Sequence, residues 1–125
     1  VMKILVNIVE GLAHLHSRGI IHGNLQGEHQ LLKFIFNRDF LAGVIYLTEE
    51  NIPKIGKVCN NKIKSNDRNL WRWWAPEVFE NGQKHSREAD IWAFGVVMWE
   101  VCTFGGLPYN DVDLDQLSQY VKYDR

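Results

Sequence analysis

The chain is poor in several features that would assign it to a particular class of protein. Its 125 residues include only two cysteines, Cys59 and Cys102. Two cysteines give neither a disulfide framework nor metal-site spacing, and a reducing compartment fits best. The formal net charge of -1 implies no strong attraction to nucleic acid or to an anionic membrane. No apolar run is long enough to span a bilayer.

What remains is one modest domain with a core of its own, in which histidine and tryptophan stand out. The five histidines have no metal-site spacing. They are His14, His16, His22, His29 and His85. The five tryptophans are interpreted as packing anchors of the core rather than as a ligand cage. They are Trp71, Trp73, Trp74, Trp92 and Trp99.

Three segments carry a helical pattern. Apolar residues recur at helical spacing from about Met2 to Arg18, and Gly19 supplies the stop. The segment Glu88–Thr103 is apolar nearly all round, which is typical of a buried helix. Asp113 can cap a last helix. The apolar stripe of that helix would consist of Leu114, Leu117 and Val121.

Two short runs between the long helices have a strand pattern. Val44–Leu47 is β-branched and aromatic, and Pro53–Val58 is a second such run. The polar residues Thr48–Asn51 lie between them and suit a turn. The sequence therefore predicts a mainly α fold with a small β-hairpin.

A long ordered motif identifies the family. It runs through Arg72-Trp73-Trp74-Ala75-Pro76-Glu77 and Ser86-Arg87-Glu88-Ala89-Asp90 to Trp99-Glu100, and ends with Gly105-Gly106 and Pro108-Tyr109. This pattern resembles the protein-kinase catalytic domain, in its tyrosine-kinase form. The resemblance implies that residues 1–125 form a partial protein-kinase-like domain. They correspond to the large (C-terminal) lobe, incomplete at both ends, without the small lobe and the terminal helices.

The resemblance also locates the catalytic loop, and that loop is altered. His22-Gly23-Asn24-Leu25 stands where the family usually has His-Arg-Asp-Leu. Asn24 takes the position of the catalytic Asp, and His29 that of the magnesium-binding Asn. A neutral amide cannot act as a general base. The altered form is similar to the pseudokinase domains of Janus kinases and the kinase-like regions of membrane guanylyl cyclases.

A second stretch also resembles the catalytic loop. Lys33–Gly43 contains Asn37-Arg38-Asp39, fifteen positions after His22-Gly23-Asn24. The stretch is either a duplicated or mis-spliced segment or an ordinary loop insertion that contains Arg-Asp. Asp39 would restore a carboxylate, but Val44 would then occupy the metal-binding position. We expect His22–Leu25 to take the catalytic-loop position beside Asp90, and Asp39 to lie well away from it.

The metal site of the family is altered as well. Lys57 follows Lys54-Ile55-Gly56 where the family has the Asp that binds magnesium. Lys57 either contacts a phosphate directly or is a solvated lysine at the end of a strand. The chain contains no glycine-rich nucleotide loop. No cofactor is therefore expected for the chain as given, whereas ATP and magnesium are expected if the family's activity is retained.

Three further residues receive structural roles from the resemblance. Asp90 would accept hydrogen bonds from the backbone of the catalytic loop and brace it. His22 would pack beneath that loop. Glu77 usually pairs with an arginine farther along the chain, and we expect it to lack that partner here.

The sequence thus predicts a catalytically degenerate, tyrosine-kinase-like fragment that acts as an interaction or regulatory module in signalling. The alternative is an active protein tyrosine kinase that transfers the ATP γ-phosphate to protein tyrosine and is represented here by a fragment or a faulty gene model. A non-functional truncated product is a third reading. We expect a protein partner, no nucleic acid and no membrane-spanning segment. The expected location is cytoplasmic, including the intracellular part of a membrane receptor.

Overall fold

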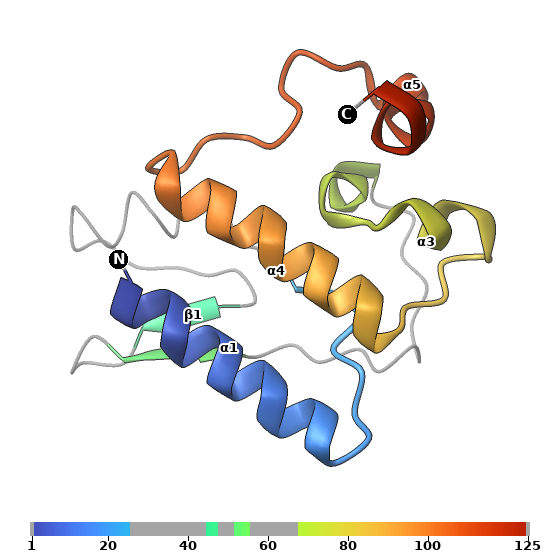
Figure 1. Cartoon of the computed structure of the whole chain (residues 1–125). Coiled ribbons are helices and arrows are strands. Elements are labelled where there is room, and N and C mark those ends of the chain that lie inside the picture. Colours follow the sequence, from blue (N-terminus) through green and yellow to red (C-terminus); the bar gives the residue numbers. More distant parts are fainter. Residues whose placement is uncertain (1, 26–44, 48–51, 56–67, 125) are drawn as a thin grey trace.

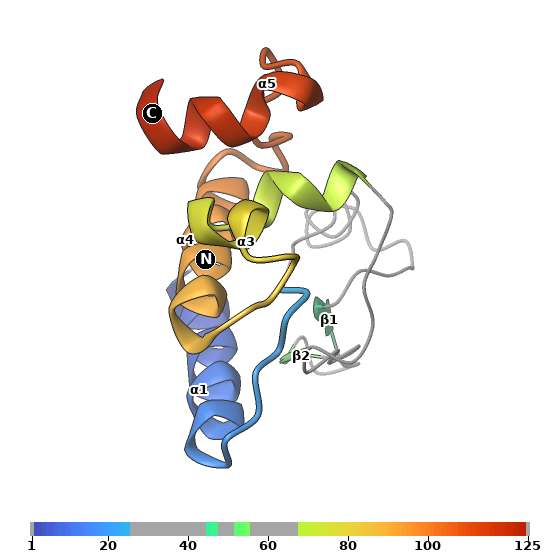
Figure 2. The ribbon, with the colours of Figure 1, turned by 90° about the vertical axis from the view of Figure 1, so that its right-hand side faces the viewer.

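The structure is a computed structural model, and it describes residues 2–25, 45–47, 52–55 and 68–124. The elements within these ranges lie in the order α1, α4, η1 and α5, each in contact with the next (Figure 1). The second view preserves this order, with α1 and α5 at opposite ends (Figure 2).

Helix α1 (Met2–Ser17) closely matches the range that the sequence predicts. Its buried residues are Leu5, Ile8 and Leu12, which lie on one face at helical spacing. The helix ends at Gly19, whose φ of 71° is the left-handed conformation that glycine adopts without strain. The N–H of Ile20 donates to the carbonyl of Leu15 at 3.0 Å, which closes the last turn. This turn sends the chain back along the helix toward α4.

Two short strands lie beside α1. β1 (Ile45–Leu47) and β2 (Pro53–Ile55) pair antiparallel, with Ile45 opposite Ile55 and Leu47 opposite Pro53. Helix α1 contacts β2. The predicted turn at residues 48–51 lies outside the described residues.

Helix α4 (Arg87–Cys102) forms the centre of the core. The hydroxyl of Ser86 caps it by accepting the Ala89 N–H at 3.1 Å. The main cluster of buried apolar residues joins α1, the segment after it, η1 and α4. Its members are Leu5, Ile8, Leu12, Leu25, Trp73, Ala93, Val96, Val97 and Val101.

Helix α4 is not buried all round, contrary to the sequence prediction. Ile91 is 60% exposed, Met98 40% and Trp99 46%. The expectation that every tryptophan anchors the core is therefore correct for Trp73 and Trp74, each 8% exposed, and wrong for Trp99. The physical reason is that the described elements pack against only part of the helix, and an apolar sequence alone does not show which part is covered.

A second apolar cluster forms where η1 (Arg68–Trp73) passes into α3 (Pro76–Glu80). Helix α5 (Leu114–Gln119) contacts η1 and continues into the π-helical turn η2 (Tyr120–Asp124). The predicted cap is confirmed, because the Asp113 carboxylate accepts the Asp115 N–H at 3.1 Å. Two members of the predicted stripe, Leu117 and Val121, are fully buried.

Candidate functional site

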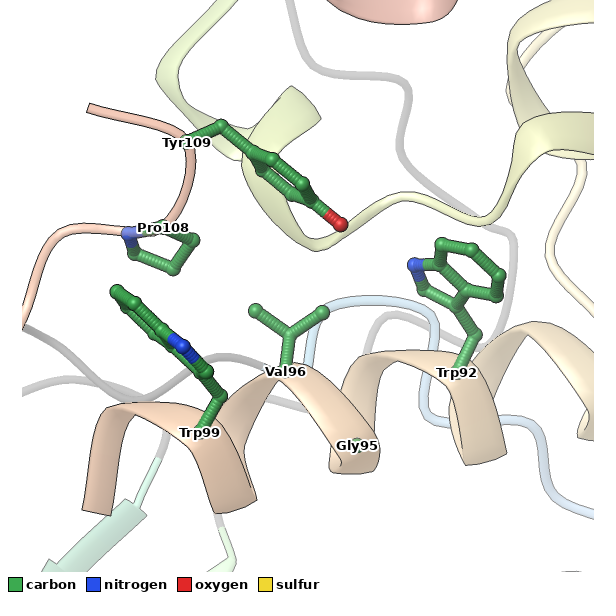
Figure 3. Close-up of a pocket in the computed structure, with 6 residues that line it drawn as sticks. All are labelled: Trp92, Gly95, Val96, Trp99, Pro108 and Tyr109. Atoms are coloured by element: carbon green, nitrogen blue, oxygen red, sulfur yellow. The ribbon is translucent and has the colours of Figure 1, made fainter. Parts of the chain in front are cut away.

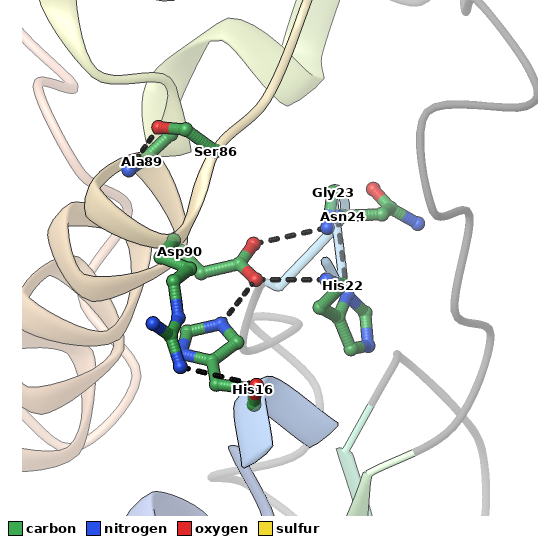
Figure 4. A network of polar contacts seen from close by, with 8 residues as sticks. His16, His22, Gly23, Asn24, Ser86, Ala89 and Asp90 are labelled. Carbon is green, nitrogen blue, oxygen red and sulfur yellow. Dashed lines mark hydrogen bonds and ion pairs between the residues drawn. The ribbon is translucent and has the colours of Figure 1, made fainter. Parts of the chain in front are cut away.

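The carboxylate of Asp90 is the centre of a buried polar network (Figure 4). The backbone N–H of His22 donates to its Oδ2 at 2.8 Å, and that of Gly23 donates to its Oδ1 at 3.0 Å. His16 Nε2 also donates to Oδ2, at 2.8 Å. Asp90 is only 1% exposed, so the three bonds replace water as the partners of a buried charge.

Local structure explains why these groups meet. Asp90 lies in the first turn of α4, where the helix dipole favours a carboxylate. Gly23 has a φ of 76°, and this left-handed backbone lets two consecutive N–H groups reach one carboxylate. The guanidinium of Arg87 donates to the backbone carbonyl of His16 at 3.0 Å. The end of α1 is thereby tied to the start of α4.

Asn24 lies beside this network and is partly buried. Its backbone N–H donates to Nδ1 of His22 at 3.1 Å, so the ring of His22 accepts at Nδ1. His22 itself is fully buried. The N–H groups that contact Asp90 are thus those of His22 and Gly23, and that of Asn24 is used one step farther out. Together these bonds hold the segment 22–24 against α4.

A small cavity of about 10 Å³ adjoins Asn24 and is lined by Leu70, Trp73, His85 and Asp90 among others. This space corresponds to about one water molecule. The free space that Asn24 shares with these residues is therefore small.

His85 completes the surroundings of Asp90. Burial lowers its pKa from the ordinary value of 6.5. The charges of Asp90 and Glu77 act in the opposite direction, while His22 lowers the pKa further. The imidazole packs edge-on against Trp74, with 5.9 Å between ring centroids. His85 therefore favours the neutral form in the folded protein.

Of the remaining predicted site residues, the structure describes only Glu77. Glu77 is exposed in the first turn of α3. Asp39 and Lys57 lie outside the described residues, as do His29 and Val44.

Sequence reasoning missed three long-range polar contacts. His16 lies 74 positions from Asp90, and nothing local marks that pairing. Arg72, which is 9% exposed, donates from Nη1 to the carbonyls of Pro108 at 2.8 Å and Tyr109 at 3.0 Å. Trp73 Nε1 donates to the fully buried Glu100 at 2.6 Å. Arg72, Trp73 and Glu100 all belong to the long motif, which was the only available signal.

Three further properties concern membrane-spanning helices, metal sites and free thiols. In the described part of the chain, every helix is too short or too polar to cross a bilayer. Within the same ranges, no three His, Cys, Asp or Glu side chains gather as a metal site would require. Cys102 is a free thiol and is exposed.

Comparison with known sequences assigns the chain to a family. The family model described as protein tyrosine and serine/threonine kinase matches residues 1–125. The chain belongs to this family.

Individual relatives agree with this assignment at low identity. The megakaryocyte-associated tyrosine-protein kinase of Mus musculus is 27% identical over 97% of this chain and 22% of its own length. The Rattus norvegicus protein of the same name is 28% identical over 97% of this chain and 24% of its own length. Fibroblast growth factor receptor 1 of Xenopus laevis is 29% identical over 92% of this chain and 13% of its own length. The chain thus spans about a quarter or less of the length of these curated relatives.

Proposed function

We propose that this chain is a catalytically degenerate, tyrosine-kinase-like large lobe that acts by interaction or regulation rather than by phosphoryl transfer. The observation that supports the proposal is that the loop held by Asp90 carries the amide of Asn24 instead of a carboxylate. The backbone of His22 and Gly23 is bonded to Asp90, and the next residue is Asn24. An amide in that place cannot accept the proton of an attacking hydroxyl at neutral pH.

The donor set supports the same proposal. Kinases of this family normally use ATP with magnesium, which prefers anionic oxygen ligands. The family positions that supply the catalytic and metal-binding groups hold an amide at Asn24, an imidazole at His29 and an ammonium at Lys57. None of these three side chains is an anionic oxygen donor, so the set does not fit magnesium.

The proposed role of Asp90 is to hold the loop in the family's position although the reacting group has changed. Its three hydrogen bonds support this role, because a buried carboxylate with satisfied bonds permits few alternative positions for the backbone that it binds. The surface around the loop would then keep a kinase-like shape that a protein partner can recognise. We propose that this recognition is the activity of the chain.

Phosphoryl transfer is the direct test. The chain is incubated with labelled ATP, magnesium and a poly-Glu-Tyr substrate, beside a double variant with Asn24→Ala and Asp39→Ala. We expect equal, background incorporation from both proteins. We also expect Asn24→Asp alone to remain inactive, because Lys57 and His29 are unchanged. Incorporation by the unmodified chain above the double variant would favour the active-kinase alternative and would overturn the proposal.

The interaction role needs a separate measurement. Proximity labelling in cells compares the unmodified chain with Asp90→Ala, which loosens the loop, and with Glu88→Ala as a control in the same turn of α4. Glu88 is exposed. We expect a set of labelled proteins that Glu88→Ala preserves and Asp90→Ala loses, at equal expression. Identical labelling by all three proteins would contradict recognition through the braced loop.

We further propose a cytoplasmic location, including the intracellular part of a membrane receptor. The free, exposed thiol of Cys102 fits a reducing compartment. One of the relatives is named as a receptor. Maleimide labelling of Cys102 in intact and permeabilised cells is the test. Labelling that needs no permeabilisation would place the chain outside the membrane.

A further inference from the structure

A cavity lies on the side of α4 that faces the segment after it, away from the Asp90 network. Six of the described residues line it: Trp92, Gly95, Val96, Trp99, Pro108 and Tyr109. Its volume is about 460 Å³. Figure 3 shows the four lining residues of α4 on one side and the Pro108–Tyr109 segment across from them, with the hydroxyl of Tyr109 directed into the space between. We call this space the aromatic cavity.

The wall opposite α4 is held in place by a buried charge. The guanidinium of Arg72 donates to the carbonyls of both Pro108 and Tyr109. Tyr109 has a φ of 53°, a left-handed conformation that is uncommon for a bulky residue. Its ring also packs against Tyr120, with centroids 5.9 Å apart. A backbone held in an unfavourable conformation by buried bonds is a fixed wall rather than a loose loop.

The indole at one end of the cavity is fixed by the backbone that follows α4. A Cβ built on Gly106 would lie 3.0 Å from Cη2 of Trp99 and 2.6 Å from Oγ1 of Thr103. Only glycine therefore lets the chain approach Trp99 so closely. The N–H of Gly106 donates to that Thr103 hydroxyl, which donates in turn to the carbonyl of Trp99 at 2.9 Å.

The indole at the other end is supported by the second apolar cluster. Trp92 packs against this cluster, whose buried members are Trp74, Ala75, Val78 and Ala89. Between the two indoles, Gly95 leaves room: a Cβ built there meets no atom within 4 Å. Both ends of the cavity are thus supported by neighbouring residues, and its floor is open at Gly95.

We propose that the aromatic cavity binds a small, flat, uncharged aromatic molecule. Its volume falls within the range of about 300–1,000 Å³ that is usual for ligand pockets. None of the described residues that line it is charged, so they offer a charged ligand no counter-ion for the hydration that it gives up on contact. Two indoles, a phenol and a proline ring offer flat faces on which an aromatic ring can stack.

Equilibrium dialysis with two probes of one ring system tests the proposal. The probes are 2-acetylnaphthalene, which is uncharged, and 2-naphthoate, its anionic counterpart at pH 7. We expect one saturable site per chain for the ketone. The carboxylate should bind at least about tenfold more weakly, which corresponds to about 1.4 kcal/mol of binding free energy.

Gly95→Leu is the decisive variant, because it fills the cavity from its open floor without meeting a neighbouring atom at Cβ. It should weaken ketone binding at least about tenfold. Glu88→Leu is the matched control, since it adds the same side chain to an exposed position of the same helix. We expect the control to bind as the unmodified chain does.

A second variant keeps the test valid if Gly95→Leu fails to fold, which far-UV circular dichroism would reveal. Tyr109→Asn removes the ring from the wall, and asparagine tolerates a left-handed backbone. It should also weaken binding. Equal binding by a folded cavity variant and the unmodified chain would mean adsorption elsewhere and would overturn the proposal. Equal affinity for the two probes would also overturn the proposal. Saturable binding of a leucine-rich helical peptide, without binding of the ketone, would overturn it as well.

Discussion

The first turn of α4 buries a carboxylate, whereas the second half of the helix leaves large apolar side chains exposed. Asp90 in the first turn is almost fully buried and makes three hydrogen bonds to the end of α1 and the loop after it. Met98 and Trp99 in the second half are 40% and 46% exposed, although both are large and apolar. A buried carboxylate must have its bonds made, whereas an exposed apolar side chain costs little.

One part of α4 therefore fixes the position of the neighbouring backbone, and another part leaves an apolar surface exposed. The directional bonds of Asp90 select one position of the His22–Gly23 backbone, because hydrogen bonds weaken steeply when their geometry changes. The apolar half makes no comparable set of directional bonds and leaves the aromatic cavity open. Under the proposed function, the first turn preserves the kinase-like loop, and the second half offers a site with no catalytic part.

The largest effect is expected at Asp90. Asp90→Ala leaves the N–H groups of His22 and Gly23 without their acceptor in the interior. The free energy of unfolding should fall by about 1–3 kcal/mol. Urea denaturation measures it, with Glu88→Ala as the exposed control, expected within about 0.5 kcal/mol of the unmodified chain. An unchanged midpoint for Asp90→Ala would show that the carboxylate does not brace the loop.

A smaller effect is expected at Arg72 of η1, which bonds the wall of the aromatic cavity opposite α4. Arg72→Met removes both bonds to the Pro108 and Tyr109 carbonyls but keeps much of the side-chain volume. We expect a loss of about 1–2 kcal/mol in unfolding free energy and faster amide exchange in residues 104–110. Arg68→Met is the matched control, because Arg68 pairs with Asp115 at the exposed surface. Equal exchange in both variants would argue against Arg72 as the support of this wall.

Two glycines, Gly95 within α4 and Gly106 after its end, sharpen the comparison. Gly95→Ala should raise the unfolding free energy by about 0.5–1 kcal/mol, since alanine favours the helix and its Cβ meets no neighbour. Gly106→Ala should lower it, since the added Cβ would meet Thr103 and Trp99. Thermal denaturation of the pair measures both signs. Two shifts of the same sign would mean that the cavity walls are not as rigid as described.

Sequence reasoning succeeded where the signal is local or belongs to a long motif. The periodicity of α1 and the stop at Gly19 are local, and the structure has both. The Asp113 cap needs only the residues beside it. The position of the loop beside Asp90 came from the family resemblance, since the partners lie 68 and 67 positions apart.

Sequence reasoning failed where a contact joins distant residues without a repeated pattern. Nothing around His16 indicates that its ring reaches Asp90, and nothing around Arg72 points to the carbonyls of residues 108 and 109. The exposure of Trp99 was missed for a different reason. A helix that is apolar all round has no preferred face, so its sequence cannot show which side the rest of the chain covers.

The smallest effect is expected for His85, which lies between the Asp90 network and the second apolar cluster. Burial lowers its pKa in the folded state, so the unfolded chain binds a proton at a higher pH than the folded chain does. The contribution to stability is therefore complete above the ordinary value of 6.5 and declines as the pH falls below it toward the lower folded pKa. His85→Gln removes the imidazole and should lose this part of the pH dependence, while every other titratable side chain is the same in both proteins. Urea midpoints at several pH values between about 7.5 and 5 measure the difference between the two curves. Parallel curves would mean that His85 has the same pKa in the folded and unfolded chain, and that the buried polar region ends at Asp90 and does not extend to this imidazole.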